Sequence, residues 1–330
     1  MQRPSPAAAL RAAALEDSRR LLARTHHDGL WSYTPGQEPS LEATAWASIA
    51  LSGREPVCEL AAERLIGCQN DDGGWPTTPN SGAPSDWNSA LALLCLRLAE
   101  PHLSERLQGS LARVYAAGID FMLSSRGVFH GLSDLASLVQ LGIVLLSPGS
   151  PCGFPWDPGT YYWTEPTGYG ILALKPHARG KSGGRSEELA TQLHRAEEFL
   201  LEHACRKGGW NHGNFVSLGK NVPAYPPTTA IALIALQDRA AAGQVAGGLA
   251  YLEGAAPGLE TVMSLALAIL ALDSYGRPVA GLTDALLSRR REDGGFGTTT
   301  MHTAMAATAL AASLGENPLI MPARAAALKS

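Results

Sequence analysis

Charged residues and long apolar runs are both scarce in this chain of 330 residues. Charged side chains make up 17% of it, and a net charge of −4 gives no electrostatic basis for binding nucleic acid. No apolar run approaches the roughly 18 residues that a membrane-spanning helix needs, and the alanine-rich N-terminus lacks the pattern of a signal peptide. We therefore expect a cytoplasmic protein without a transmembrane segment, and peripheral contact with a membrane stays open.

Common motifs for nucleotides, metals and disulfide frameworks are missing as well. The five cysteines are scattered, and none forms a Cys-x-x-Cys pair. The chain has no phosphate-binding loop, no dinucleotide-binding glycine pattern, no His-Glu-x-x-His and no Gly-x-Ser-x-Gly. These absences argue against P-loop and Rossmann nucleotide sites, zinc proteases of that motif and α/β-hydrolases.

A short phrase returns along the chain: a charged or polar residue, one or two glycines, then an aromatic residue. Its clear copies end at Trp31, Trp75, Trp210 and Phe296, looser copies end at Phe129 and contain Phe154, and a worn copy is expected at Tyr251–Gly258. The spacing indicates a repeat of about 43 residues, enough for two helices and two loops. We expect the glycine to let the backbone turn after a helix, and the aromatic side chain to pack between neighbouring repeats.

The helices expected around these phrases are of two kinds. Those before a phrase are amphipathic, with predicted ranges Glu16–Arg24, Cys58–Cys68, Ser104–Ser124, Ser186–Cys205 and Thr283–Arg291. Those after a phrase are almost uncharged and must be buried on all sides. Their predicted ranges are Ala43–Leu51, Ser89–Leu98, Leu135–Leu146, Thr167–Leu174, Thr229–Leu236, Thr261–Leu272 and Thr303–Leu314.

Two concentric layers of helices satisfy both patterns. The sequence therefore predicts an all-α fold, an α/α toroid of about six helical hairpins with an uncharged inner ring and an amphipathic outer ring. An open solenoid is the alternative, but both terminal hairpins resemble the middle ones and lack polar caps. We expect a single toroid domain over residues 1–330, with an irregular insertion around 125–165 and a flexible loop at 176–186.

The repeats resemble those of a known superfamily. The segment Cys68–Trp75 is similar to the Gln-Trp repeat of squalene–hopene and oxidosqualene cyclases, and Glu165–Tyr169 and Pro226–Ala230 resemble the Pro-Thr-Ala step that opens their inner helices. The run Gly208–Asn214 with Tyr225–Thr229 is similar to bacterial single-toroid proteins with prenyltransferase and squalene-oxidase repeats. The resemblance implies the toroid fold, which hosts terpenoid cyclases, protein prenyltransferases and non-catalytic thioester domains alike. The Cys-Gly-Glu-Gln sequence of the thioester domains is missing.

The resemblance to cyclases points to one candidate acid. Class II terpene cyclases protonate their substrate with the middle aspartate of Asp-x-Asp-Asp-Thr-Ala, which must stay protonated. The nearest counterpart is Ser85–Ala90, where Trp87 takes the place of the acid, Asn88 that of the last aspartate, and Asp86 lies one position away. The intact motif is absent. Asp86 is nevertheless a candidate catalytic acid, with Trp87 and Asn88 as candidates for substrate binding; alternatively, Ser85 and Asp86 cap the following helix.

The resemblance to protein prenyltransferases points to a second pair. These enzymes hold zinc with Asp, Cys and His at inner-helix starts. Met301–Ala304 resembles the step that carries their histidine, and Glu260 stands one hairpin earlier, where the cysteine is missing. Glu260 and His302 are thus candidate catalytic groups at neighbouring helix mouths. Two ligands do not complete a zinc site, so we expect no cofactor, with zinc left open as an alternative.

Other inner-helix starts supply the rest of a pocket rim, namely Glu42, Asp134, Glu165 and Thr228. Glu165 follows Tyr162 and Trp163, and an acid beside aromatic rings suits a site that binds a prenyl chain or stabilises a carbocation. The same rings could instead pack a loop against the core. Glu165 is therefore a candidate catalytic residue, and Tyr162, Trp163, Asp134 and Thr228 are candidates for substrate binding. His212 is either an acid or base or a hydrogen-bonding residue of a turn.

The leading hypothesis for function is an isoprenoid-related enzyme. It would be terpenoid cyclase-like or prenyltransferase-like and act on a hydrophobic prenyl chain in a central cavity. The alternative is a non-catalytic toroid that binds a lipid or a protein partner, which the degenerate acid and zinc motifs favour.

Overall fold

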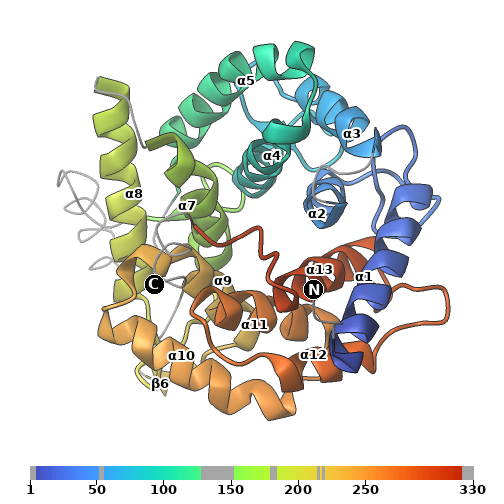
Figure 1. Ribbon diagram of the computed structural model, residues 1–330. Helices are drawn as coiled ribbons and strands as arrows, with labels where there is room; N and C mark the ends of the chain where they lie inside the picture. Colours follow the sequence, from blue (N-terminus) through green and yellow to red (C-terminus); the bar gives the residue numbers. More distant parts are fainter. Residues whose placement is uncertain are drawn as a thin grey trace.

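The computed structural model describes residues 5–51, 56–127, 152–178, 184–213, 216–217 and 220–321. Its helices form two rings, one inside the other (Figure 1). The inner ring contains α2 (Leu41–Leu51), α4 (Asp86–Ala99), α7 (Thr164–Ala178), α9 (Pro226–Ala235), α11 (Val262–Ser274) and α13 (Thr300–Ser313). The outer ring contains α1 (Pro6–Thr25), α3 (Pro56–Gly67), α5 (Glu105–Ser124), α8 (Gly184–Glu202), α10 (Gly243–Ala255) and α12 (Ala280–Leu287). The predicted α/α toroid of helical hairpins is confirmed.

Short elements decorate the loops between the rings. In the part of the chain that the structure describes, three hairpins with two-residue strands pair β1 (Trp75–Pro76) with β2 (Pro84–Ser85), β3 (Phe154–Pro155) with β4 (Tyr162–Trp163), and β5 (Val216–Ser217) with β6 (Lys220–Asn221). Three single turns of 3₁₀ helix cover Glu100–His102, Gln237–Arg239 and Ala256–Gly258. These elements connect helices and add little to the core.

The ring closes through the same backbone bond that joins neighbouring hairpins. Each inner helix contacts the next one, and α13 contacts α2. At four inner-helix starts an N–H donates to a carbonyl of another hairpin, in the pairs Leu41 to Thr77 (3.1 Å), Trp87 to Trp156 (3.4 Å), Thr164 to His212 (3.2 Å) and Thr300 to Tyr33 (2.8 Å). The last pair joins the final inner helix to the first hairpin. An open solenoid has no such bond between its ends.

The repeated aromatic residue fastens each inner helix to an outer one. Trp31, Trp75, Phe154, Trp210 and Phe296 are at most 1% exposed. The backbone N–H of each donates, over 2.8 to 3.0 Å, to the hydroxyl of a Thr or Ser in the inner helix that follows. The three indole N–H groups donate to carbonyls in the last turn of the preceding outer helix, which are those of Leu22, Leu65 and Leu200. Each copy of the phrase is therefore a structural joint, by which we mean the contact that connects an inner helix to the outer helix before it.

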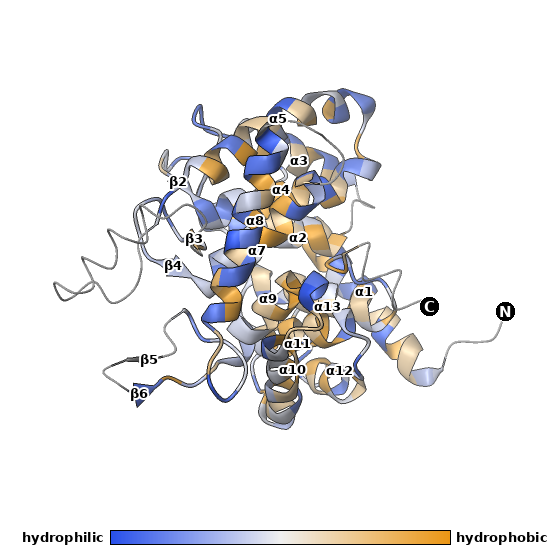
Figure 2. Cartoon of the chain, turned by 90° about the vertical axis from the view of Figure 1, so that its left-hand side faces the viewer, coloured by the Kyte–Doolittle hydropathy of each residue, from blue (hydrophilic) through white to orange (hydrophobic). Residues whose placement is uncertain are grey.

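Polarity divides the two rings as predicted. The inner helices are buried along most of their length, and hydrophilic residues gather on outer helices such as α5 and α8 (Figure 2). Lys175 of α7 is a buried charged residue of the inner ring. Its charge is paired there, because the ammonium lies 2.7 Å from Glu197 and 3.0 Å from the carbonyl oxygen of Ala235. None of the described helices has the length and apolar character needed to cross a bilayer.

Several predicted boundaries are wrong. The outer helix α10 was not predicted, and it includes Tyr251–Ala255, so the worn repeat turns only from Ala256 onward. Residues 176–178 end α7 and residues 184–186 begin α8, so the loop predicted at 176–186 is helical at both ends. Helix α12 ends at Leu287, before the predicted Arg291. The predicted helix Leu135–Leu146 and the copy at Phe129 lie outside the described residues.

Candidate functional site

The inner helices all begin at one face of the ring, which we call the front. A cavity of about 390 Å³ lies there over the N-terminal ends of α2 and α4. We call it the front cavity; its lining includes Tyr33, Glu42, Trp87, Asn88, Trp156 and Asp157. Trp87 and Asn88 are two of the predicted substrate-binding residues. The other four come from inner-helix starts and from the loops behind the repeated aromatic residues.

Glu42 is the acid most closely associated with this cavity. It is the second residue of α2, is partly buried, and accepts a hydrogen bond from the Tyr33 hydroxyl. Burial raises the pKa of Glu42, while the Tyr33 hydroxyl and the Trp87 indole oppose that shift more weakly. The carboxyl therefore keeps its proton to a higher pH than a solvated glutamate does.

Aromatic rings form the walls around Glu42. The ring centres of Trp87 and Trp156 are 4.4 Å apart, and Tyr169 meets Trp87 edge-on at 4.6 Å and Trp46 edge-on at 6.2 Å. Burial, followed by the charges of Glu42 and Glu165, raises the pKa of Tyr169 far above its usual value. The Tyr169 hydroxyl and the Trp46 indole nitrogen are buried and have no hydrogen-bond partner among the described residues. Buried polar atoms of this kind are normally paired, so an ordered water or a ligand is the expected hydrogen-bond partner.

Glu165 forms a second polar group with His212. Its Oε1 pairs with Nδ1 of His212, and its Oε2 is buried without a partner among the described residues. The hydrogen bond to Glu165 raises the pKa of His212, and burial opposes this. The imidazole also lies 5.7 Å from the ring of Trp163 and 5.3 Å from that of Tyr225. The structure therefore brings the predicted residues Glu165 and Trp163 together through His212.

Asp86 is buried and is not among the residues that line this cavity. It is fully buried at the start of α4, and neither carboxylate oxygen has a hydrogen-bond partner among the described residues. Burial raises its pKa to about 7, the charge of Asp157 adds to this, and Ser125 opposes it. The capping interpretation of Ser85 and Asp86 is wrong, because no side chain caps this helix start and the Ser85 hydroxyl donates to the Trp156 carbonyl at 3.0 Å.

The other predicted site residues lie apart from the front cavity. Tyr162 packs against Phe199 of α8 with ring centres 6.0 Å apart, and the Thr228 hydroxyl donates to the Trp210 carbonyl at 2.6 Å. Both therefore contribute to the fold. Asp134 lies outside the described residues.

The predicted pair Glu260 and His302 is not linked. Glu260 is exposed, and no hydrogen bond or ion pair joins it to His302. Burial lowers the pKa of His302, whose Nδ1 has no described partner. Within the described ranges, no three His, Cys, Asp or Glu side chains are grouped so that they could hold a metal ion.

Sequence reasoning missed Tyr33, Trp156 and Tyr169 as site residues. A positional signal could have found the first two, because each stands two residues after a repeated aromatic, as His212 does. The carbonyl at that position accepts a hydrogen bond from the first turn of a neighbouring inner helix. The residue therefore lies at the front of the ring, where the inner helices begin. Tyr169 is one helical turn after Glu165 and therefore lies on the same face of α7.

Comparisons with known proteins identify the fold. The sequence matches no protein-family model and no curated protein. Among solved structures, a variant of the type II terpene cyclase MstE from Scytonema, in complex with its substrate geranylgeranyl dihydroxybenzoate, is similar at a TM-score of 0.58 and 13% identity over 95% of this chain and 99% of that one. A wild-type glycosidase is similar at a TM-score of 0.64 and 13% identity over 97% of this chain and 100% of the other.

An α-amylase from Clostridium perfringens is similar as well, at a TM-score of 0.62 and 10% identity over 94% of this chain and 99% of the other. At such low identity these likenesses show the toroid fold alone. The fold is cyclase-like, and it is equally like that of the glycosidases.

Proposed function

We propose that this protein is an isoprenoid-converting enzyme that starts its reaction by protonating a carbon–carbon double bond in the front cavity. The observation that carries the proposal is the position of the Glu42 carboxyl, which faces the cavity, has a raised pKa and stands among the rings of Trp87, Trp156 and Tyr169. An acid for this chemistry must keep its proton, and the cation that it creates needs aromatic faces rather than water.

The proton balance of such a reaction needs one acid and one base. Glu42 transfers its proton to an alkene carbon, which forms a C–H bond and leaves a tertiary carbocation beside a carboxylate. A second double bond attacks the cation and closes a ring. The new cation then loses a proton to Asp157, a carboxylate that lines the same cavity, and the product has the same formula as the substrate. Solvent then takes up the proton from the base and returns one to Glu42.

The test replaces Glu42 with Gln, which keeps the shape of the side chain but cannot supply the proton. We expect kcat on a geranylgeranylated phenol or on geranylgeraniol to fall by about 10² to 10⁴. The wild-type rate should also fall as the pH rises through the raised pKa of Glu42. The matched control is Glu38→Gln, an exposed carboxylate of the same cavity, which should change kcat less than about twofold. Unchanged turnover by Glu42→Gln would refute the assignment.

Glycoside hydrolysis is a second candidate, favoured by one observation. Asp157 lines the same cavity as Glu42, and paired carboxylates are the machinery of glycosidases, with which this chain shares its fold. Release of nitrophenol from nitrophenyl glycosides, abolished in both Glu42→Gln and Asp157→Asn, would support this candidate over the isoprenoid one. Tight binding of a prenyl chain with no turnover of either substrate class would instead indicate the non-catalytic binding toroid.

A further inference from the structure

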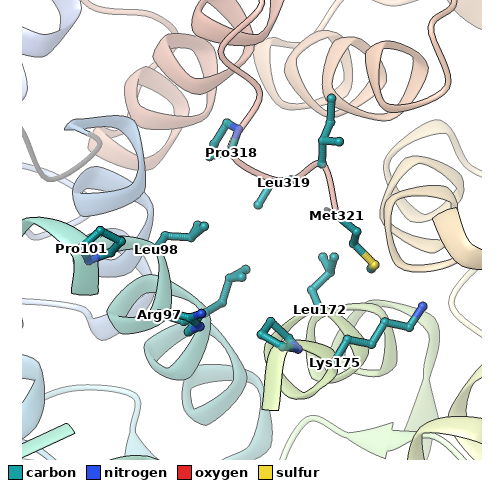
Figure 3. A pocket seen from close by; sticks show the side chains of 11 residues that line it. Arg97, Leu98, Pro101, Leu172, Lys175, Pro318, Leu319 and Met321 are labelled. Carbon is teal, nitrogen blue, oxygen red and sulfur yellow. The ribbon is translucent and has the colours of Figure 1, made fainter. Parts of the chain in front are cut away.

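A second, larger hollow lies at the opposite end of the inner helices. This rear pocket has a volume of about 570 Å³ (Figure 3). Its walls are aliphatic and come from three segments: Leu94 and Leu98 of α4, Leu172 of α7, and Leu319, Ile320 and Met321 from the chain after α13. In Figure 3 the side chains of Leu98 and Leu172 point into the space between these segments.

The third wall is a fixed strap across the ring. The buried side-chain amide of Gln237 donates to the Leu319 carbonyl at 2.8 Å and accepts from the Met321 N–H at 3.0 Å. Upstream, the Asn317 amide donates to Asp273 at 2.9 Å. Because these bonds fix the polar backbone of the strap, its apolar side chains are left to face the pocket. An aliphatic wall held by buried polar contacts is typical of a preformed ligand site.

The charges of the described lining residues disfavour an anionic ligand in the rear pocket. Among the described residues that line it, the cationic ones are Arg97 and Lys175. The Arg97 guanidinium lies 2.5 Å from Glu100, and the Lys175 ammonium lies 2.7 Å from Glu197 and 3.4 Å from Asp238. Figure 3 shows the ammonium of Lys175 directed away from the centre. Both residues therefore contribute aliphatic stems, and because their charges are paired, neither is a ready counter-ion for a carboxylate or a phosphate.

We propose that the rear pocket binds an uncharged isoprenoid chain, at a site separate from the front cavity. A water molecule has a share of about 30 Å³ in the liquid, so 570 Å³ accommodates about 19 atoms of that size. That is the size of a chain of about 15 to 20 carbons. The proposal does not depend on the reaction proposed for the front cavity. The two sites have no described lining residue in common, but both lie on α4, with Trp87 at the front cavity and Leu94 at the rear pocket.

The test measures equilibrium binding of farnesol and geranylgeraniol to the full chain by calorimetry. Ile320→Asp places an unpaired charge on the strap at a partly exposed position, and Leu98→Trp fills the pocket without charge. Each should weaken prenol binding at least tenfold, with the melting temperature checked for each protein. The conservative Ile320→Leu should bind within about twofold of the wild type.

Two results would overturn the proposal. The first is prenol binding that both Ile320→Asp and Leu98→Trp leave unchanged while they fold normally. The second is palmitate binding more tightly than farnesol, because the paired cations should reject its carboxylate. Loss of turnover in Glu42→Gln with prenol binding intact would leave this site standing, and prenol binding without any turnover would count only against the front-cavity reaction.

Discussion

Replacing Asp86 with Asn should stabilise the protein strongly at pH 8 and hardly at all at pH 4. In the unfolded chain this carboxyl titrates near 3.8, whereas in the folded protein burial raises its pKa to about 7. The folded state therefore holds the proton more tightly, and the stability that this provides is complete below about pH 4 and is lost as the pH rises to about 7. A difference of about three units at 1.36 kcal/mol each amounts to about 4 kcal/mol. Asn has the shape of the protonated acid and cannot ionise, so the variant escapes that loss.

Guanidinium unfolding at pH 4, 6 and 8 measures this difference directly. The free energy of unfolding of Asp86→Asn minus that of the wild type should grow by about 4 kcal/mol from pH 4 to pH 8, with most of the change below pH 7. Asp71→Asn removes an exposed carboxylate and is the control for the change in net charge. A difference that stays constant within 1 kcal/mol across the three pH values would show that Asp86 titrates as a solvated acid and is not buried as described.

Two further predictions concern the structural joints. Trp75→Ala removes a fully buried indole and its bond to the Leu65 carbonyl, so the free energy of unfolding should fall by about 3–5 kcal/mol and the melting temperature with it, while an unchanged melting curve would contradict the joint. Gly73→Ala should cost about 2 kcal/mol or more, because Gly73 has φ +90° and a Cβ there would lie 2.2 Å from the Ala117 carbonyl oxygen. Gly36→Ala, at φ +85° in open space, isolates the backbone strain and should cost less; equal losses would show that the clash is relieved.

The sequence sufficed to predict the toroid because the same residues recur wherever the same contact must be made. Each repeated aromatic needs a glycine turn before it and a hydroxyl after it, as in Trp75 with Gly73 and Ser89. The hydroxyl satisfies a backbone N–H that would otherwise be buried without a partner. An uncharged helix after each phrase then has nowhere to lie except inside the ring.

Helix α10 was not predicted because it lacks the two signals of an outer helix, which are several charged residues and a repeated aromatic residue after it. Its thirteen residues include one charged side chain, Glu253, and no repeated aromatic residue follows it. It is an outer helix that resembles an inner one in composition, so a rule based on charge could not assign it. Its position follows from the ring, since α9 and α11 need a returning helix between them.

The candidate site was harder to predict because neighbours in sequence turn to different sides of a helix. Asp86 and Trp87 are adjacent, yet Trp87 lines the front cavity and Asp86 does not, since successive helical residues point about 100° apart. Alignment to a cyclase motif places both at the start of the same helix and cannot choose between them. Glu42 could be placed on the rim from its position at a helix start. Its raised pKa comes from burial, which the hydrogen bonds of Tyr33 and Trp87 partly oppose, and no local pattern specifies that burial.

One position around the ring shows how this fold can change chemistry without changing shape. The second residue of an inner helix faces the residue that stands two places after the next repeated aromatic. In α4 the two are Trp87 and Trp156, whose rings are in contact at 4.4 Å with their planes tilted by 38°. In α7 the equivalent two are Glu165 and His212, which form a hydrogen bond. In both hairpins a backbone N–H at the helix start donates to the carbonyl of that later residue, from Trp87 itself in α4 and from Thr164, one residue before Glu165, in α7. Because that bond is independent of the side chains, the pair can become aromatic or acid–base by substitution alone, and one scaffold can serve unrelated reactions.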